Sequence, residues 1–129
     1  MSNVPKDLKY TKDHEWALIE GNRAKVGITD YAQSHLGDIV FVDLPPVGKE
    51  VKKGEVLLAV ESVKTASDVF APLSGKVVEV NGVLTNAPEK VNQDPYGEGF
   101  MVVIEIAKPE EAGELMGPEE YESFLSTVS

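Results

Sequence analysis

Short runs of apolar and β-branched residues, separated by turn residues, recur along most of the chain, and this pattern predicts strands. The runs at 16–19 and 23–28 flank a turn at 20–22, which predicts a hairpin whose second strand buries alternate residues: Ala24, Val26 and Ile28. Further strands are expected at 39–42, 55–60, 76–80 and 100–106. This regular spacing is typical of a mainly β fold, a sandwich or barrel, with helices at its periphery.

Two segments change to the period of a helix. A short helix is expected near residues 30–36, with Thr29 or Asp30 as its cap, Gln33 completing a capping box on Asp30, and Gly37 as its stop. A second helical segment is expected at about 109–128. It carries an apolar stripe that should pack on the core: Tyr121, Phe124, Leu125 and Val128. Residues 82–99, which contain several prolines and glycines, predict a long loop.

Composition narrows the possible functions. The chain has 129 residues and no cysteine, so one domain over 1–129 is expected, without disulfides or a thiolate nucleophile. Its net charge of −10 disfavours binding to nucleic acid or to an anionic membrane surface, and no 18-residue apolar stretch is present. Six of its glutamates fall in residues 109–129, which hold no basic residue; we expect a solvated helix face there, the alternative being a docking surface for a basic partner.

The N-terminal residues carry no targeting signal. They lack both the apolar core of a signal peptide and the arginine-rich composition of a transit peptide. We therefore expect a cytoplasmic protein of a bacterium, or else the processed form of a protein of the mitochondrial matrix.

One lysine stands out for its position. Lys64 lies in a turn, 61–68, between the apolar run 55–60 and a second run that continues over 69–80. The residues around it are small, so a modifying enzyme and later partners could reach the amine. Most lysines in turns are only solvated, but in a chain with no other evident chemistry this one indicates a carrier of something attached at Lys64.

The hairpin of residues 51–80 resembles the biotinyl/lipoyl-attachment hairpin. Biotin carriers typically have methionine on both sides of the lysine, whereas this chain has Val63 and Thr65. Glu-Ser-Val-Lys followed by Ser-Asp is similar to the lipoylated hairpin of the glycine cleavage system H-protein family. Four further blocks resemble signatures of that family in the same order: residues 10–16, 26–33, 36–45 and 91–99.

The resemblance implies a function. Lipoic acid would be attached covalently to Lys64 as N6-lipoyllysine, and its disulfide would supply the sulfur that the chain lacks. The arm would shuttle an aminomethyl group from glycine decarboxylase (P protein) to the aminomethyltransferase (T protein), and dihydrolipoyl dehydrogenase (L protein) would reoxidise it. The chain itself would be a non-catalytic, monomeric carrier with a lipoyl-domain-like β-sandwich, a barrel-sandwich hybrid, whose hairpin core spans about 51–80.

The same resemblance assigns candidate residues. Glu15, Asp68 and His35 are expected near the docked arm, in a carboxylate-lined cleft that suits a cationic amine; the alternatives are an exposed strand carboxylate for Glu15, a turn-stabilising carboxylate for Asp68 and a surface histidine for His35. Glu61 and Gly75 are expected to present Lys64 to a lipoyl ligase or transferase, with Gly75 fixing the return turn through a positive φ. Because cysteine is absent, no metal site is expected.

Three other functions remain open on the sequence. A lipoyl domain of a 2-oxoacid dehydrogenase usually sits in a longer chain with Ala/Pro-rich linkers and has an aspartate before its lysine, where this chain has Val63. A lipoate donor or relay is possible as an additional role. An independent enzyme is disfavoured, because the chain has no nucleophile–base pattern, phosphate loop or metal cluster.

Overall fold

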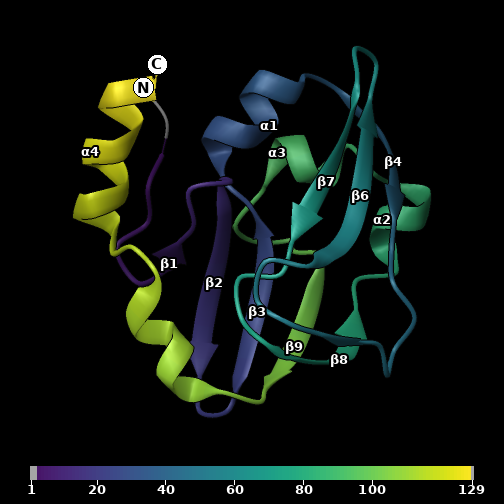
Figure 1. The fold of residues 1–129 in the computed structure, drawn as a ribbon. Helices are drawn as coiled ribbons and strands as arrows, with labels where there is room; N and C mark the ends of the chain where they lie inside the picture. Colours follow the sequence, from purple (N-terminus) through teal and green to yellow (C-terminus); the bar gives the residue numbers. More distant parts are fainter. Residues whose placement is uncertain (1–2, 129) are drawn as a thin grey trace.

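Two open antiparallel sheets form the fold in the computed structural model, which describes residues 3–128. In spatial order, the larger sheet contains β1 (Lys9–Tyr10), β2 (Glu15–Glu20), β3 (Arg23–Ile28), β9 (Val102–Ile106), β8 (Gly75–Val80) and β5 (Glu50–Val51). The smaller sheet contains β4 (Ile39–Asp43), β6 (Val56–Ser62) and β7 (Ala66–Phe70). The expected mainly β sandwich is therefore confirmed (Figure 1).

The main core lies between the sheets and draws on both. Alternate side chains of β3 are buried in it, as the sequence pattern predicted: Ala24, Val26 and Ile28. The smaller sheet contributes Val42, Leu58, Val60 and Val69 to the same cluster. Its middle strand, β6, is apolar on both faces, as expected for an inner strand.

A second, smaller cluster lies on the opposite face of β1 and β2. Trp16 points into it, whereas its neighbour Ala17 points into the main core, because successive side chains of a strand face opposite ways. The cluster is covered by the C-terminal helix α4 (Pro118–Val128), whose Tyr121 is fully buried there. The predicted stripe is right for Tyr121, Phe124 and Leu125, which pack into this cluster, but wrong for Val128, which is 45% exposed.

The other helices are short. α1 (Asp30–Leu36) is capped by the Thr29 side chain, which accepts from the Ala32 N–H at 3.2 Å, and it ends at Gly37 with φ 82°, as expected. The Gln33 side chain contacts the Asp30 carboxylate at 2.8 Å rather than closing a box on the backbone. The predicted loop at 82–99 contains two single helical turns, α2 (Val83–Asn86) and α3 (Lys90–Gln93).

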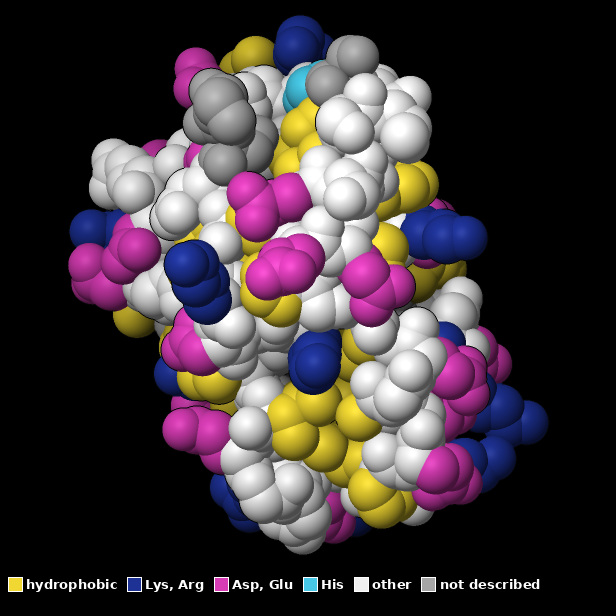
Figure 2. Space-filling view, turned by 90° about the vertical axis from the view of Figure 1, so that its left-hand side faces the viewer, with side chains coloured by type: hydrophobic (Ala, Val, Ile, Leu, Met, Phe, Trp, Pro, Cys, Tyr) yellow, Lys and Arg dark blue, Asp and Glu magenta, His cyan; other side chains and the backbone are white. Residues whose placement is uncertain are grey.

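The C-terminal segment begins with the 3-10 helix η1 (Pro109–Glu114) and continues into α4. Most of its glutamates are solvated, as expected, and Figure 2 shows this side of the molecule with acidic side chains scattered among basic and apolar ones. Glu111 differs, because its carboxylate accepts from the Ser74 N–H at 2.8 Å and from the Ser74 hydroxyl at 2.9 Å. Within residues 3–128, no helix is long and apolar enough to cross a membrane.

Candidate functional site

Lys64 lies at the tip of the β6–β7 hairpin, which extends beyond the rest of the smaller sheet in Figure 1. The turn is tighter than predicted, because β6 runs through Ser62 and β7 starts at Ala66, so only residues 63–65 connect them. The Ser62 side-chain oxygen accepts from the N–H groups of Lys64 and Thr65 at 3.2 and 3.1 Å. A side chain of the strand itself thus closes the turn and fixes the backbone at the lysine.

The hairpin tip rests on the connection between α1 and β4. The Val63 N–H donates to the Asp38 carbonyl at 3.0 Å, and a Cβ built on Gly37 would lie 3.2 Å from Lys64 Cε. The lysine stem therefore passes over the end of α1. Its amine makes no ion pair and no hydrogen bond within residues 3–128 and is open to acylation.

Asn92 of α3 holds the same connection in place, a contact that the sequence did not reveal. Its amide donates to the Gly37 carbonyl at 2.9 Å and to Gln33 Oε1 at 3.0 Å, and its Oδ1 accepts from the Ile39 N–H at 2.8 Å. Three of the four hydrogen-bonding positions of this side chain are used, and they tie α3 to both ends of the α1–β4 connection. Asn92 thereby positions the surface on which the Lys64 turn rests.

A cavity of about 270 Å³, the arm cavity, lies between the start of β2, α1 and the hairpin. All three residues predicted for a cleft line it: Glu15, His35 and Asp68. The remaining lining is largely apolar and includes Ile28, Ala32, Leu36, Val60 and Val69. Its further polar members are Asp13, His14 and Ser67. Lys64 is not among the residues that line this cavity, but α1 and β7, which line it through Leu36 and Ser67, both lead from it toward the Lys64 turn.

Glu15 is buried, with 2% of its surface exposed, so the alternative of an exposed strand carboxylate is wrong. Its Oε1 accepts from the Thr11 hydroxyl at 2.5 Å and its Oε2 accepts from the Phe70 N–H at 3.1 Å. Burial raises the pKa of Glu15 to about 7 from an ordinary 4.5, against the opposing effect of these two hydrogen bonds. Near neutral pH this carboxyl group is poised between its two protonation states.

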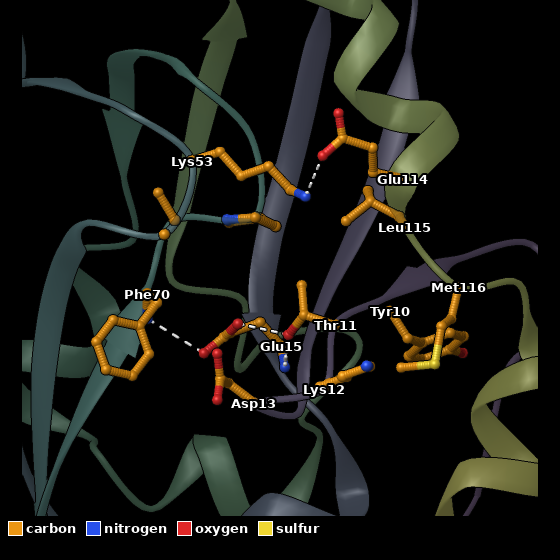
Figure 3. A pocket seen from close by; sticks show the side chains of 13 residues that line it. Tyr10, Thr11, Lys12, Asp13, Glu15, Lys53, Phe70, Glu114, Leu115 and Met116 are labelled. Atoms are coloured by element: carbon orange, nitrogen blue, oxygen red, sulfur yellow. Dashed lines mark hydrogen bonds and ion pairs between the residues drawn. The ribbon is translucent and has the colours of Figure 1, made fainter.

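Glu15 also lines a second cavity, of about 420 Å³, which Figure 3 shows. In this view its carboxyl group reaches toward the backbone of Phe70, and Thr11 lies on its other side. Lys53 and Glu114 form an ion pair of 2.8 Å at the cavity. Glu15 therefore lies between the two cavities, and a change of its charge would alter the electrostatic potential in both.

Asp68 and His35 differ from Glu15 in being exposed. The Asp68 carboxylate makes no hydrogen bond within residues 3–128, so the alternative role of stabilising its own turn finds no contact there. His35 stacks on Tyr31 with 4.0 Å between ring centroids, and its Nδ1 lies 3.2 Å from the Tyr31 carbonyl. Asp68 is thus a free carboxylate at the cavity, and His35 is part of the α1 wall.

The two residues expected to present Lys64 lie in different sheets. Glu61 is exposed on β6, opposite Ala66 and three residues before the lysine. Gly75 starts β8 in the larger sheet, and it is not among the residues with positive φ, so the predicted turn geometry is wrong. A Cβ at Gly75 would lie 2.2 Å from the Glu105 carbonyl oxygen, so glycine is required there by the close approach of β9.

Comparisons with known proteins agree with this geometry. The family model described as Glycine cleavage H-protein matches residues 8–128. The chain belongs to the glycine cleavage H-protein family. It is 55% identical over 125 residues to the glycine cleavage system H protein of Carboxydothermus hydrogenoformans, covering 97% of this chain and 96% of that protein. It is 56% identical over 126 residues to that of Stenotrophomonas maltophilia, with the same coverage.

A solved member of the H-protein family has the same fold. The crystal structure of a glycine cleavage system H protein from Mycobacterium marinum superposes with a TM-score of 0.86 at 43% identity, covering 93% of this chain and 97% of that one. Membership of the H-protein family sets aside the alternative of a 2-oxoacid dehydrogenase domain, because the match extends through both helical segments that a minimal lipoyl domain lacks.

Proposed function

We propose that this chain is the lipoyl-bearing carrier of a glycine cleavage system, with lipoic acid in amide linkage to Lys64. The observation that carries the proposal is the free Lys64 amine at a hairpin tip whose strand β7 leads to a cavity with carboxylates and apolar walls, in a member of the H-protein family. Amide formation removes the ammonium charge and leaves a long, flexible arm. When bound, the lipoyl group supplies a disulfide that can be reduced and reformed.

The lining of the arm cavity fits such an arm and a cationic cargo. Apolar side chains such as Leu36, Val60 and Val69 suit a hydrocarbon chain, and the carboxylates of Asp68 and Glu15 suit an amine. A cation beside Glu15 favours its ionised form and would lower its raised pKa. The chain's own part is to hold the aminomethyl cargo, orient it and limit its contact with water.

The partners follow from this role. Glycine decarboxylase would load the arm, the aminomethyltransferase would unload it, and dihydrolipoyl dehydrogenase would restore its disulfide, after a lipoyl ligase or transferase has modified Lys64. The carrier catalyses none of these steps, and the tether raises the local concentration of the cargo at each enzyme. The core shared by both sheets supports one lipoyl-carrier domain over 1–129. The bacterial relatives support a place in the cytoplasm.

The mass of the intact protein tests the proposal. After treatment with a lipoyl ligase and lipoate, the protein should gain one lipoyl group, and glycine with glycine decarboxylase should then add an aminomethyl group. Lys64→Arg should gain neither, whereas Lys76→Arg, which changes another exposed lysine, should gain both. A lipoyl group without the glycine-dependent adduct would indicate a generic lipoyl carrier or relay. No lipoyl group at all would overturn the assignment of Lys64.

A further inference from the structure

A chain of hydrogen bonds connects the C-terminal helix to the arm cavity, although α4 contributes no residue to the cavity lining. The hydroxyl group of Tyr121 lies 2.8 Å from His14 Nδ1 and 2.7 Å from Thr29 Oγ1. His14 lines the cavity, and Thr29 caps α1, which forms one of its walls. One buried hydroxyl group thus joins three parts of the chain that lie far apart in the sequence.

Only one arrangement of the protons in this hydrogen-bond chain gives both hydroxyl groups an acceptor. Thr29 Oγ1 accepts from the Ala32 N–H, so its own proton can only go to the Tyr121 oxygen, the one other polar atom it contacts in residues 3–128. The Tyr121 proton then goes to His14 Nδ1. The reverse direction would leave the Thr29 hydroxyl without an acceptor, in a residue that is fully buried. In this arrangement His14 is a neutral imidazole with its proton on Nε2.

The backbone and ring of His14 are held from several sides. Its φ of 69° lies in the left-handed region, which is uncommon for residues other than glycine. The His14 N–H donates to the Thr11 carbonyl at 3.1 Å, and the His14 carbonyl accepts from the Thr29 N–H at 3.0 Å. The ring packs 4.5 Å from Tyr31, centroid to centroid. Such local strain persists where the surrounding structure fixes it, often at functional sites.

We propose that Tyr121 is a positioning residue that holds His14 as a neutral imidazole and so keeps positive charge away from the arm cavity. The inference rests on the proposed function, in which the cavity receives a cationic amine. The cavity lining holds the carboxyl groups of Asp13, Glu15 and Asp68, and an imidazolium at His14 would oppose their attraction for that amine. Burial lowers the pKa of His14, His35 across the same cavity acts in the same direction, and the charge of Asp13 opposes them without reversing the shift.

The first test measures His14 in the protein without lipoate. The ¹⁵N chemical shifts of its ring should show Nδ1 as an acceptor and Nε2 as protonated. Tyr121→Phe keeps the ring and removes the hydroxyl, so the tautomer preference should be lost and the pKa of His14 should rise. Tyr10→Phe is the matched control. Tyr10 is equally buried, stacks on Tyr121 at 4.6 Å, and donates to the Pro5 carbonyl at 2.5 Å instead.

Two results of this test would overturn the inference: a proton on Nδ1 in the unaltered protein, or the same His14 spectrum in Tyr121→Phe as in the unaltered protein. A change of equal size in Tyr10→Phe would also overturn it, because it would trace the effect to general loosening of the aromatic cluster. Circular dichroism of both variants checks that they remain folded.

The second test measures how long the protein retains an aminomethyl group in the absence of the aminomethyltransferase. Tyr121→Phe should shorten this lifetime by about 3- to 10-fold, the usual effect of one hydrogen bond, and Tyr10→Phe should leave it unchanged. If Tyr121→Phe retains the cargo normally while Asp68→Asn releases it faster, the inference on Tyr121 is wrong, but the proposed role of the cavity in holding the cargo is upheld. If Asp68→Asn and Glu15→Gln also retain it normally, the proposed role of the cavity in holding the cargo is wrong as well.

Discussion

The buried carboxyl group of Glu15 should make the protein less stable as the pH rises. The unfolded carboxyl titrates near 4.5 and the folded one at about 7, so the folded state binds the proton more tightly. The stability that protonation gives is complete below pH 4.5 and is lost as the pH rises to 7. These two pKa values correspond to a loss of about 2 to 3 kcal/mol between pH 5 and pH 8, as an upper bound.

Glu15→Gln removes this charge while it preserves the shape of the side chain. The amide oxygen can accept from the Phe70 N–H, as Oε2 does now, and the NH₂ group can donate to the Thr11 hydroxyl oxygen. We therefore expect the variant to gain free energy of unfolding relative to the unaltered protein as the pH rises, by about 2 to 3 kcal/mol between pH 5 and pH 8.

Urea denaturation at both pH values measures this difference. Glu20→Gln is the matched control, because Glu20 lies at the other end of the same strand and is exposed. Comparing each variant with the unaltered protein at the same pH removes the contribution of the rest of the net charge of −10. A difference for Glu15→Gln that stays constant from pH 5 to pH 8, or that follows Glu20→Gln, would refute the assignment of a raised pKa to buried Glu15.

Three further changes have defined outcomes. Gly75→Ala should lower the free energy of unfolding by at least about 2 kcal/mol in urea titrations, because the new Cβ meets the Glu105 carbonyl; a neutral effect would contradict the close packing of β8 on β9. Asn92→Ala should cost about 2–3 kcal/mol by the same measurement, because it leaves the Ile39 N–H and the Gly37 carbonyl without partners, whereas Gln93→Ala serves as control. Glu61→Ala should slow lipoylation of Lys64 in a ligase assay without changing the melting temperature, and an unchanged rate would remove its recognition role.

The sequence was sufficient where local chemistry decides the structure. Alternation in Ala24, Val26 and Ile28 located a strand and its buried face, and Thr29 and Gly37 bounded a helix. The position of Lys64 in a turn between two apolar runs followed from the same pattern. These features depend on residues close in sequence, so a period or a cap residue reveals them.

Contacts between distant segments left no comparable signal. Glu15 is buried and accepts from the Phe70 N–H, 55 positions away, and a glutamate between His14 and Trp16 at the start of a strand gives no hint of that contact. In the sequence, Asn92 is one polar residue of a predicted loop, although in the structure it ties α3 to α1 and β4. A glycine in the sequence does not show why glycine is required there, because either a positive φ or a close approach of strands can require it. Gly75 is an example, since the second cause applies and not the first.

The two halves of the site depend on the fold in different ways. The Lys64 turn is closed by Ser62 within one hairpin, so under the proposed function we expect a ligase to recognise it wherever that hairpin forms. The arm cavity is built from β2, α1, β6 and β7, and α4 reaches it through Tyr121. Local opening of the C-terminal helix would therefore disturb the cavity before the turn. Variants that loosen α4 should accept lipoate normally and yet retain their cargo poorly. Such variants would separate the attachment of lipoate to Lys64 from the protection of the cargo in the arm cavity.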